Sequence, residues 1–554
     1  MSVAERFITH TVENQAPPLP HYNAWLSDIA LREAVQREGG GWAEAHLSEF
    51  GAVAGGELME LGYTANENKP KLRAFDRYGH RIDEVEFHPS YHRVMQLGMQ
   101  YGVHAFAWRH EDRAGAHVAR AALSYLHAQA EAGTGCPLTM THSAVPALRH
   151  EPKLAEVWVP RITSYAYDPR VLPASDKSGC MIGMGMTEKQ GGSDVRSNTT
   201  RAYPQADGSY ELVGHKWFFS APMCDAWLVL AYVHSQQGDA GLGCYLMPKL
   251  RPDGSRNAIR IQRLKDKLGD WSNASSEVEL QGAWAQRVGG EARGVATILE
   301  MVALTRLDCM IGSSALMRQA LVQALHHARH RKAFGRLLIE QPLMRNVLAD
   351  LALESEACTA LALRVARAVD AQARDPAEAA LARIATAIGK YWVCKRCPPL
   401  VNEAQECLGG AGYVEESNLP RLYRQAPLNS IWEGSGNIQC LDVLRALSKQ
   451  PETREALFGE LMTAKGGNAH LDREIAWLAG AFDDVTTLEL RSRMLVERMA
   501  LALQAAILVG GGNAAVADVF CATRLGGEHG LNYGTLPAGA PLAELIERAM
   551  PAAG

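Results

Sequence analysis

One carboxylate in this sequence stands in a setting suited to acid–base chemistry. Glu433 follows Trp432 and precedes Gly-Ser-Gly in the segment NSIWEGSGNIQCLDVLR, and we expect a helix to begin near Ile438. A surface glutamate needs no such junction between apolar residues and glycines. A glutamate that accepts a proton at neutral pH does need it, because desolvation raises the carboxyl pKa toward working pH. Glu433 is therefore the candidate general base.

Glycines and hydroxyls gather in a second segment, GMGMTEKQGGSDVRSNTT, residues 183–200. Thr187, Ser193 and Asp194 surround two adjacent glycines. Backbone N–H groups in such a turn, with hydroxyls beside them, suit a phosphate group or the polar edge of a ring. The alternative is an ordinary loop that enters a strand, with glycines for the turns and Ser and Thr as caps.

An aromatic segment and two loops could complete a ligand site. GHKWFFSAP places aromatic rings beside Ser220, either as the flank of a flat conjugated ring or as a core strand. The basic cluster of HHARHRKAFGR suits a pyrophosphate, or else a solvated helix end that complements the helix dipole. The glycines of QECLGGAGY allow a close backbone approach to a ligand, although they could also form a helix C-cap.

Several common catalytic motifs are missing from the sequence. It has no GxGxxG after a strand, no GxxxxGK, no HExxH and no GxSxG, so nicotinamide, P-loop, zincin and serine-hydrolase interpretations lose support. The one CxxC, Cys394 and Cys397, has no second CxxC or His pair nearby. We interpret it as two cysteines three residues apart on a helix, and we expect no metal site.

The elements that must position these residues change in character along the chain. Residues 20–180 are rich in helix formers, short β-branched and aromatic runs follow to about residue 294, and helical periodicity then resumes. Pro398-Pro399 should kink or break the third helix of the resulting bundle. We expect a mainly α protein with four domains: an N-terminal helical domain 1–180, a middle antiparallel sheet or β-barrel 181–294, a helical bundle 295–449 and an extra C-terminal helical domain 450–554.

Size and composition indicate a multidomain protein of the cytoplasm. The 554 residues exceed what one core can bury, and the net charge of -5 argues against a generally basic protein that coats nucleic acid. Eleven scattered cysteines fit reduced thiols. The N-terminus lacks an apolar signal segment, and the most apolar run, MALALQAAILVGGG, is too short to span a bilayer. We expect a cytoplasmic location and no membrane partner.

Taken together and in this order, these segments resemble the acyl-CoA dehydrogenase family of flavoproteins. MTEKQGGSD is similar to the family's (L/M)TEPxAGSD, HRKAFG to RxxFG, LGGAGY to GGxGY and IWEGSGNIQ to IYEGTxxIQ. GHKWFFS, RLKDKLG, EESNLPRLYR and DRYGHRIDEVEFHP resemble its AidB-type branch, the alkylation-response proteins. The resemblance covers almost the whole chain. It implies the family's fold of N-terminal helical domain, middle β-barrel and four-helix bundle, with an extra C-terminal helical domain.

The resemblance also implies an FAD site. Phe218 stands where the family usually has a Trp against the isoalloxazine, and Ser220 stands where it has a Thr hydroxyl near N5. The implied cofactor residues are Met186, Thr187, Gly192, Ser193, Trp217, Phe218, Ser220, Arg331, Phe334, Gly409, Gly410, Ser435, Asn437 and Gln439. Of these, Arg331 and Phe334 would contact the ADP half of an FAD held mainly by a neighbouring subunit. The implied assembly is a homo-oligomer, a homotetramer in the family's pattern.

Glu433 matches the family's catalytic base. It would remove the α-proton of an acyl-CoA, short or branched chains included, while the β-hydride goes to flavin N5. Some relatives carry the base on an earlier helix, one residue before an arginine. Here Thr305 precedes Arg306, so Glu433 has no rival. Two departures from the family pattern are Lys189, which replaces a proline, and Glu406, which stands where a glutamine commonly meets the cofactor phosphates.

The AidB-type resemblance further implies a role in the response to DNA alkylation damage. The alternative function is a DNA-binding protective flavoprotein with little or no acyl-CoA dehydrogenase activity. The C-terminal domain that would contact double-stranded DNA has 8 Lys and Arg against 13 Asp and Glu. Candidate contacts to DNA are Arg445, just before that domain, and Arg491, Arg493, Arg498 and Arg524 within it. The basic stretch 251–267 could instead supply about six phosphate contacts, or it could be a solvated strand face.

Overall fold

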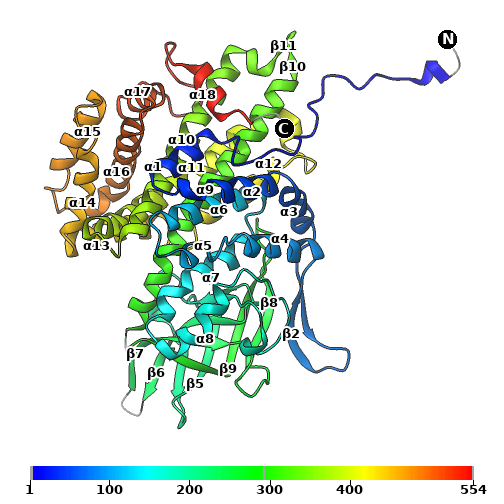
Figure 1. Ribbon diagram of the computed structural model, residues 1–554, viewed down its shortest axis with the longest axis vertical. Coiled ribbons are helices and arrows are strands. Elements are labelled where there is room, and N and C mark those ends of the chain that lie inside the picture. Colours follow the sequence, from blue (N-terminus) through cyan, green and yellow to red (C-terminus); the bar gives the residue numbers. More distant parts are fainter. Residues whose placement is uncertain (1–3, 236–237, 291–292, 552–554) are drawn as a thin grey trace.

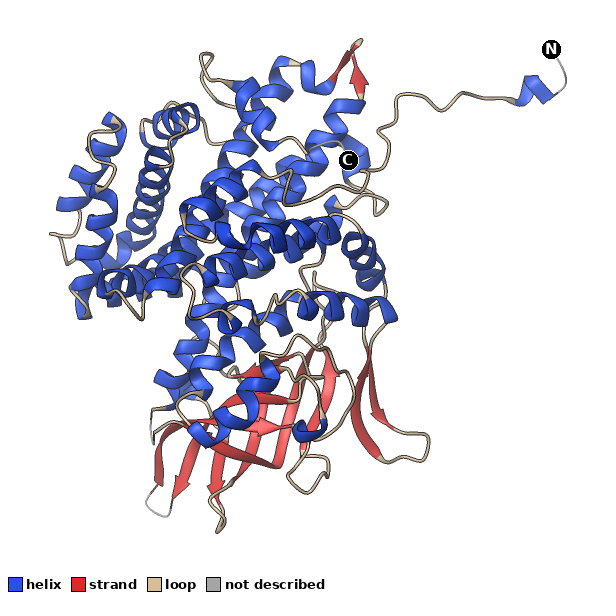
Figure 2. Cartoon of the chain, viewed as in Figure 1, coloured by secondary structure: helices blue, strands red, loops and turns tan. Residues whose placement is uncertain are grey.

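The computed structural model describes residues 4–235, 238–290 and 293–551, and it shows a mainly helical protein built around one β-barrel (Figure 2). In Figure 1 the barrel lies at one end of the long axis and the helical bundle extends to the other end. The N-terminal helices lie across the middle, and the C-terminal helices α14 to α17 stand beside the bundle. This arrangement confirms the predicted fold class.

Two of the N-terminal helices, α1 and α4, begin at residues whose side chains cap the helix. The Asp28 carboxylate accepts a hydrogen bond from the N–H of Leu31, and α4 begins with Pro89 directly after His88, whose ring accepts from the N–H of Ser90. The helices are α1 Ile29–Arg37, α2 Glu44–Ala54, α3 Glu57–Glu67, α4 Pro89–Gln100, α5 Phe106–Arg109, α6 Ala116–Ala130, α7 Gly135–Leu148 and α8 Pro152–Ile162.

A β-hairpin interrupts these helices, and the interpretation of residues 20–180 as helices and loops missed it. Strands β1 Lys71–Phe75 and β2 Arg81–Glu86 pair antiparallel. The Asp76 carboxylate fixes the turn by accepting hydrogen bonds from two N–H groups of the turn. The hairpin contacts the barrel, where Arg81 donates to the carbonyl of Ile261 at 2.8 Å. This long-range contact is invisible to local periodicity.

The barrel closes because five strands form an unbroken ring of hydrogen bonds. In the described residues β6 pairs with β4, β4 with β5, β5 with β9, β9 with β7 and β7 again with β6, while β3 joins β6 and β8 joins β9. Buried and exposed residues alternate along β5, as a sheet with one face inside predicts. The strands are β3 Ile182–Gly185, β4 Arg201–Pro204, β5 Tyr210–Ser220, β6 Ala226–Ser235, β7 Gly238–Pro248, β8 Ile259–Leu264 and β9 Ser275–Val288.

Long helices form the bundle that follows the barrel. They are α9 Gly294–His330, α10 Pro342–Ala371, α11 Pro376–Cys407 and α13 Gly436–Lys449, with the short α12 Leu419–Gln425 and the small hairpin β10 Lys332–Ala333 and β11 Arg336–Leu337 between them. Of the two predicted effects of Pro398-Pro399, the break does not occur, because α11 continues through both prolines, and the kink stays a prediction. It also carries Cys394 and Cys397, so the predicted helical spacing of this pair is confirmed.

The C-terminal region adds a lobe of helices and then returns to the bundle. Its helices are α14 Glu452–Met462, α15 Ala469–Gly480, α16 Leu488–Gly510, α17 Ala514–Phe520 and α18 Leu542–Ala549. Helix α18 packs against α10 and α1, so the end of the chain is tied to the core of the molecule. Among the described helices, none combines the length and apolar character needed to cross a membrane.

Candidate functional site

The carboxylate of Glu433 lies in a sheltered position between the bundle helices. Glu433 is half-buried in the loop that leads into α13, and its Oε2 accepts a hydrogen bond from the Thr305 hydroxyl of α9 at 2.7 Å. Burial raises the pKa of Glu433, while the Thr305 hydrogen bond and the charges of Lys390 and Arg306 partly oppose that rise. A carboxylate shifted in this direction is suited to accept a proton near neutral pH.

The backbone of Glu433 is held in an unusual conformation. Its φ of 57° lies in the left-handed region, which costs a non-glycine residue on the order of 1–3 kcal/mol. Arg306 Nε donates to the carbonyl of Glu433 at 3.0 Å, and Gln439 Nε2 donates to the carbonyls of Glu433 and Gly434 at 3.1 and 2.9 Å. Side chains from α9 and α13 thus hold the base from two directions.

Lys390 supplies a third contact to the same loop from α11. Its side chain is buried, and Nζ donates to the carbonyl of Trp432 at 2.7 Å and to that of Gly434 at 2.5 Å. The two carbonyls flank Glu433 on either side in the sequence. We call Arg306, Lys390 and Gln439 the carbonyl clamp. Sequence analysis missed it, although a lone lysine within the apolar run IGKYWV was a detectable signal.

The clamp is itself anchored by an ion-pair cluster. Arg306 Nη1 lies 2.8 Å from Asp442 Oδ2, and Arg383 Nη2 lies 2.8 Å from Asp442 Oδ1. These contacts join α9, α11 and α13, so three helices meet around the Glu433 loop. Trp432, which precedes the base, is half-buried and donates from Nε1 to the side-chain oxygen of Asn429 at 2.9 Å.

The loop that follows β3 is shaped by a buried ion pair that the sequence analysis did not identify. Glu188 accepts hydrogen bonds from Lys216 Nζ at 2.8 Å, from the Thr200 hydroxyl at 2.6 Å and from the N–H of Thr199 at 2.6 Å. Although burial opposes the shift, Lys216 and these donors lower the pKa of Glu188 to about 2. The pair fixes the loop and leaves Thr187 half-buried beside the exposed glycine and serine of GGS.

Aromatic side chains lie next to this loop on β5. The N–H of Trp217 donates to the carbonyl of Thr187 at 2.8 Å, and Phe218 is 51% exposed. Lys265 Nζ lies 3.5 Å from the centroid of the Trp217 ring and 4.5 Å from that of Phe218. An exposed aromatic surface with a cation above it and hydroxyls at its edge can hold a flat, electron-poor ring system.

Two serine hydroxyls, those of Ser220 and Ser275, lie at the end of β5. The oxygens of Ser220 and Ser275 lie 3.3 Å apart, on paired positions of β5 and β9. Both hydroxyls keep hydrogen-bonding capacity for a ligand, because each can donate one bond and accept two.

Four other predicted cofactor residues have free space around them, an unused polar atom or an exposed side chain. An added Cβ at Gly409 or Gly410 would meet nothing within 4 Å, and Gly409 has a φ of 60°. Gln439 Oε1 is buried and has no hydrogen-bond partner in the described part of the chain. The side chain of Phe334 is 99% exposed. These features fit an FAD that lies along the barrel and the bundle.

The predicted cofactor residues fall into separate groups in the fold. Met186, Thr187 and Trp217 belong to the barrel, whereas Arg331 and Phe334 belong to the β10–β11 hairpin. Figure 1 shows that hairpin at the end of the long axis opposite the barrel strands. One protomer therefore does not bring both groups to the same dinucleotide.

The arginines predicted to contact DNA differ widely in accessibility. Arg524 is enclosed, with its side chain 7% exposed and Nη2 2.5 Å from Asp350 Oδ1, so a phosphate could not reach it. Arg498 forms an ion pair with Glu474 and lies 3.5 Å from the Trp477 ring, and Arg491 donates to carbonyls of its own loop. Arg445 and Arg493 are exposed.

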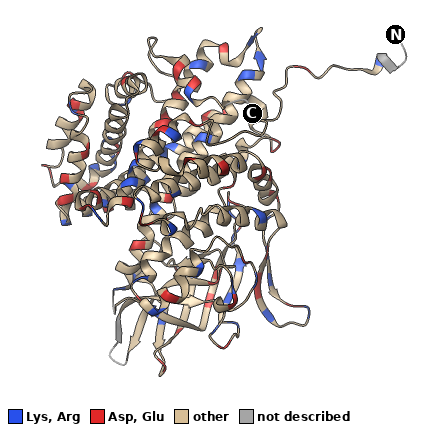
Figure 3. Cartoon of the chain, viewed as in Figure 1, with Lys and Arg blue, Asp and Glu red and all other residues tan. Residues whose placement is uncertain are grey.

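The basic stretch 251–267 is neutralised by acidic neighbours. Arg256 pairs with Glu84, and Arg263 and Lys265 share Glu277 at 2.7 and 2.6 Å. The expectation of about six free phosphate contacts from this stretch is not met, because its cations are already paired or buried. Figure 3 likewise shows acidic and basic residues mixed over the barrel and the C-terminal helices.

Comparison with protein families matches three consecutive regions of the chain. Residues 14–169 match the adaptive response protein AidB N-terminal domain, residues 183–283 the acyl-CoA dehydrogenase middle domain, and residues 292–448 the acyl-CoA dehydrogenase C-terminal domain. The extra helices that follow residue 449 lie beyond these matches.

Individual relatives match across most of their length. AidB of Escherichia coli (strain K12) is 53% identical over 469 residues, covering 84% of this chain and 86% of that protein. Acyl-CoA dehydrogenase family member 11 of Caenorhabditis elegans is 32% identical, covering 82% and 75%. The crystal structure of C. elegans ACDH-11 in complex with C11-CoA superposes with a TM-score of 0.84 at 27% identity, covering 94% of this chain and 93% of that chain.

Proposed function

The chain belongs to the acyl-CoA dehydrogenase family of FAD-dependent oxidoreductases, in its AidB branch, and we propose that Glu433 is the base that removes the α-proton of an acyl-CoA. The observation that carries this proposal is the setting of its carboxylate, which burial shifts toward a higher pKa beside the Thr305 hydroxyl. FAD, when bound, supplies the acceptor for the hydride that leaves the β-carbon. The carbonyl clamp would keep the Glu433 carboxylate in place during proton removal.

The FAD site that we propose uses the barrel loop and the bundle. Thr187 and Ser193 would hold the polar edge of the flavin and the pyrophosphate, and Trp217 and Phe218 would cover the ring. Ser220 would place its hydroxyl at the reactive edge. The remainder would be lined by the open backbone at Gly409 and Gly410 and by Gly192, Met186, Ser435, Asn437 and Gln439. The unpartnered Oε1 of Gln439 supports this assignment, because a buried oxygen without a donor is costly.

Assembly into a homo-oligomer is part of the same proposal. Arg331 and Phe334 lie at the far end of the bundle from the barrel, and Phe334 is almost fully exposed. A neighbouring subunit that brings its β10–β11 hairpin to the ADP half would complete the site, in a tetramer of the family's pattern. Light scattering of the FAD-loaded protein should give a multiple of 60.3 kDa, and Arg331→Ala should lower FAD retention. A monomer with full FAD occupancy would refute this assembly.

The base assignment is tested by anaerobic reduction of the flavin. We expect the purified protein to be yellow and a short or branched acyl-CoA to bleach it. Glu433→Gln should abolish bleaching while the flavin spectrum and the FAD content stay unchanged, because the amide cannot accept the proton. Glu416→Gln, an exposed carboxylate change, serves as the matched control. If Glu433→Gln bleached as fast as the wild type, the assignment would be wrong.

DNA association in the response to alkylation damage is a second candidate function. The AidB match and the extra C-terminal lobe support it, and Arg445 and Arg493 are the accessible candidates on that side of the molecule. Two phosphate contacts per protomer would give a salt slope of about -2, weaker than the sequence suggested. Titration of duplex DNA at several salt concentrations tests this. Failure to bind at low salt would leave the dehydrogenase proposal standing alone.

The cysteines support a location in the cytoplasm. All eleven are buried free thiols, which suits a reducing compartment. Alkylation protection and acyl-CoA oxidation both act on cytoplasmic molecules, so the two candidate functions share this location.

A further inference from the structure

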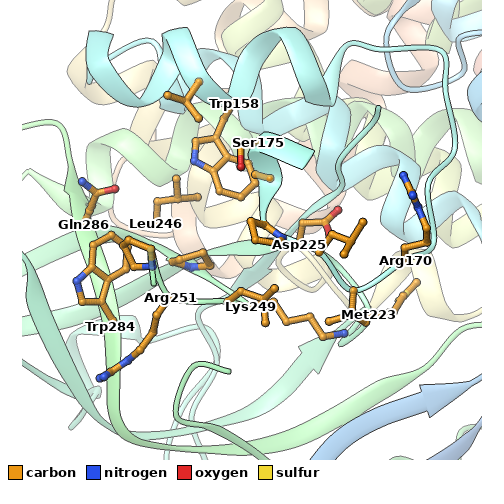
Figure 4. Close-up of a pocket in the computed structure, with 18 residues that line it drawn as sticks. Trp158, Arg170, Ser175, Met223, Asp225, Leu246, Lys249, Arg251, Trp284 and Gln286 are labelled. Atoms are coloured by element: carbon orange, nitrogen blue, oxygen red, sulfur yellow. The ribbon is translucent and has the colours of Figure 1, made fainter. Parts of the chain in front are cut away.

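A second cavity lies between helix α8 and the barrel, among residues with no part in the proposed flavin site. It has a volume of about 220 Å³ and is lined by α8, the segment 170–175, the loop before β6, the end of β7 with the segment 249–252 that follows it, and part of β9. Figure 4 shows its side chains. Neither Glu433 nor any predicted cofactor residue lines it.

The walls of this cavity are apolar and aromatic at one end. Trp158 from α8, Leu246 from β7 and Trp284 from β9 lie together there in Figure 4. Leu246 pairs with Gln286 across β7 and β9, so that wall is part of the barrel and is rigid. Two indole rings and an aliphatic side chain give a flat or short-chain apolar group a surface to pack against.

A cation without a partner stands at the other end. Lys249 is half-buried, and in the described residues its Nζ has neither a hydrogen-bond partner nor an ion-pair partner. The charged groups around it are Asp225, directly before β6, Glu84 from the hairpin and Arg256 from the loop after β7. Burial lowers the pKa of Lys249, and Asp225 opposes that change.

The carboxylate of Asp225, near Lys249, already has other hydrogen-bond donors. Asp225 accepts hydrogen bonds from Lys177 Nζ at 2.6 Å and from the N–H of Met181 at 2.9 Å. Its charge is therefore balanced by Lys177, whose side chain is 2% exposed. Two further cations, Arg170 and Arg251, line the cavity, and each has an acidic neighbour: Arg170 Nη2 lies 2.7 Å from Asp168 Oδ2, and Arg251 Nη2 lies 3.9 Å from Glu211 Oε1. Lys249 is therefore the lining cation for which the described residues show no partner.

We propose that this cavity binds a small amphipathic carboxylate, with its carboxylate on Lys249 and its apolar part against Trp158 and Trp284. A monoanion fits better than a phosphate dianion, because only one lysine at the cavity lacks a partner and each additional buried charge must be desolvated. The volume suits an aromatic or branched acid of modest size rather than a coenzyme A thioester. Its function would be independent of the flavin site.

The test is calorimetric titration of the FAD-loaded protein with phenylacetate, hexanoate and the neutral analogue phenylacetamide. We expect the two acids to bind at millimolar concentrations or below, the amide to bind much more weakly, and the flavin absorbance spectrum to remain unchanged. Lys249→Met should weaken binding of the two acids by about 10- to 100-fold, because one charge-assisted hydrogen bond is lost. Lys153→Met, an exposed lysine on α8, is the matched control.

A second variant separates loss of the site from loss of the fold. Ser175→Trp places a large ring at the exposed rim of the cavity and should block the acids while FAD content and melting temperature stay at wild-type values. The proposal would be overturned if acid and amide bound equally well, if Lys249→Met bound the acids with unchanged affinity, or if binding changed the flavin spectrum. So would the absence of binding heat for both acids.

Discussion

Replacement of Lys390 by methionine tests whether the carbonyl clamp positions the base. Methionine has nearly the length of lysine but donates no hydrogen bond, so the carbonyls of Trp432 and Gly434 would lose their shared donor. Each such bond to a charged group contributes about 1.5–3 kcal/mol. Because Glu433 is held at a φ of 57°, which costs about 1–3 kcal/mol, loss of the clamp would let the loop relax to an ordinary conformation.

The expected effect on the reaction follows from these magnitudes. If displacement of the base raises the activation free energy of flavin reduction by about 1.4–2.8 kcal/mol, reduction by acyl-CoA slows about 10- to 100-fold. The charge of Lys390 also lowers the pKa of Glu433, so its removal should move the acid limb of the rate–pH profile to higher pH. A variant that only disturbed the position of the loop would slow the reaction without shifting the acid limb of the rate–pH profile.

The assay is anaerobic stopped-flow bleaching of the flavin, measured across pH with FAD content and melting temperature as controls. Lys449→Met, an exposed lysine at the end of α13, should leave both the rate and the pH profile unchanged. If the Lys390→Met variant bleached at the wild-type rate and its acid limb did not shift, the proposed role of the carbonyl clamp would be refuted.

Three further predictions concern the other polar contacts. Thr305→Val removes the hydroxyl that lowers the pKa of Glu433, so the acid limb of flavin reduction should shift to higher pH, and an unshifted limb would contradict this role. Glu188→Gln leaves its buried lysine partner without a counter-charge and should destabilise the protein by about 3–5 kcal/mol in denaturant titration. Because the folded-state pKa of Glu188, about 2, lies below its usual value of 4.5, its contribution is complete above pH 4.5 and is lost as pH falls toward 2, so the variant should show less acid dependence of stability. Arg445→Ala should weaken duplex DNA binding and flatten its salt dependence. Arg524→Ala should instead lower the melting temperature, because its buried carboxylate partners would lose their counter-charge. The reverse pattern would place the DNA surface elsewhere.

Local pattern was sufficient for much of the architecture. The alternation of short β-branched runs predicted an antiparallel sheet or barrel, and the three- and four-residue spacing of apolar residues predicted the bundle, because backbone geometry imposes these periods on any element with one buried face. The same local rules did not anticipate two features. Pro398-Pro399 does not break α11, and the charged segment around Asp76 forms a hairpin that the barrel stabilises.

The sequence by itself determined the family, the cofactor class and the segment that carries Glu433, because those motifs are contiguous stretches of residues. Only the tertiary structure decided how that segment is held. Thr305, Arg306, Lys390 and Gln439 come from three helices and meet at one loop, and the burial of Arg524 depends on carboxylates from α10. The donors Thr305 and Arg306 lie 128 and 127 residues from Glu433, and Lys390 lies 42 residues from Trp432. Contacts between residues this far apart leave no periodic trace in the chain, so they become visible only when the helices pack.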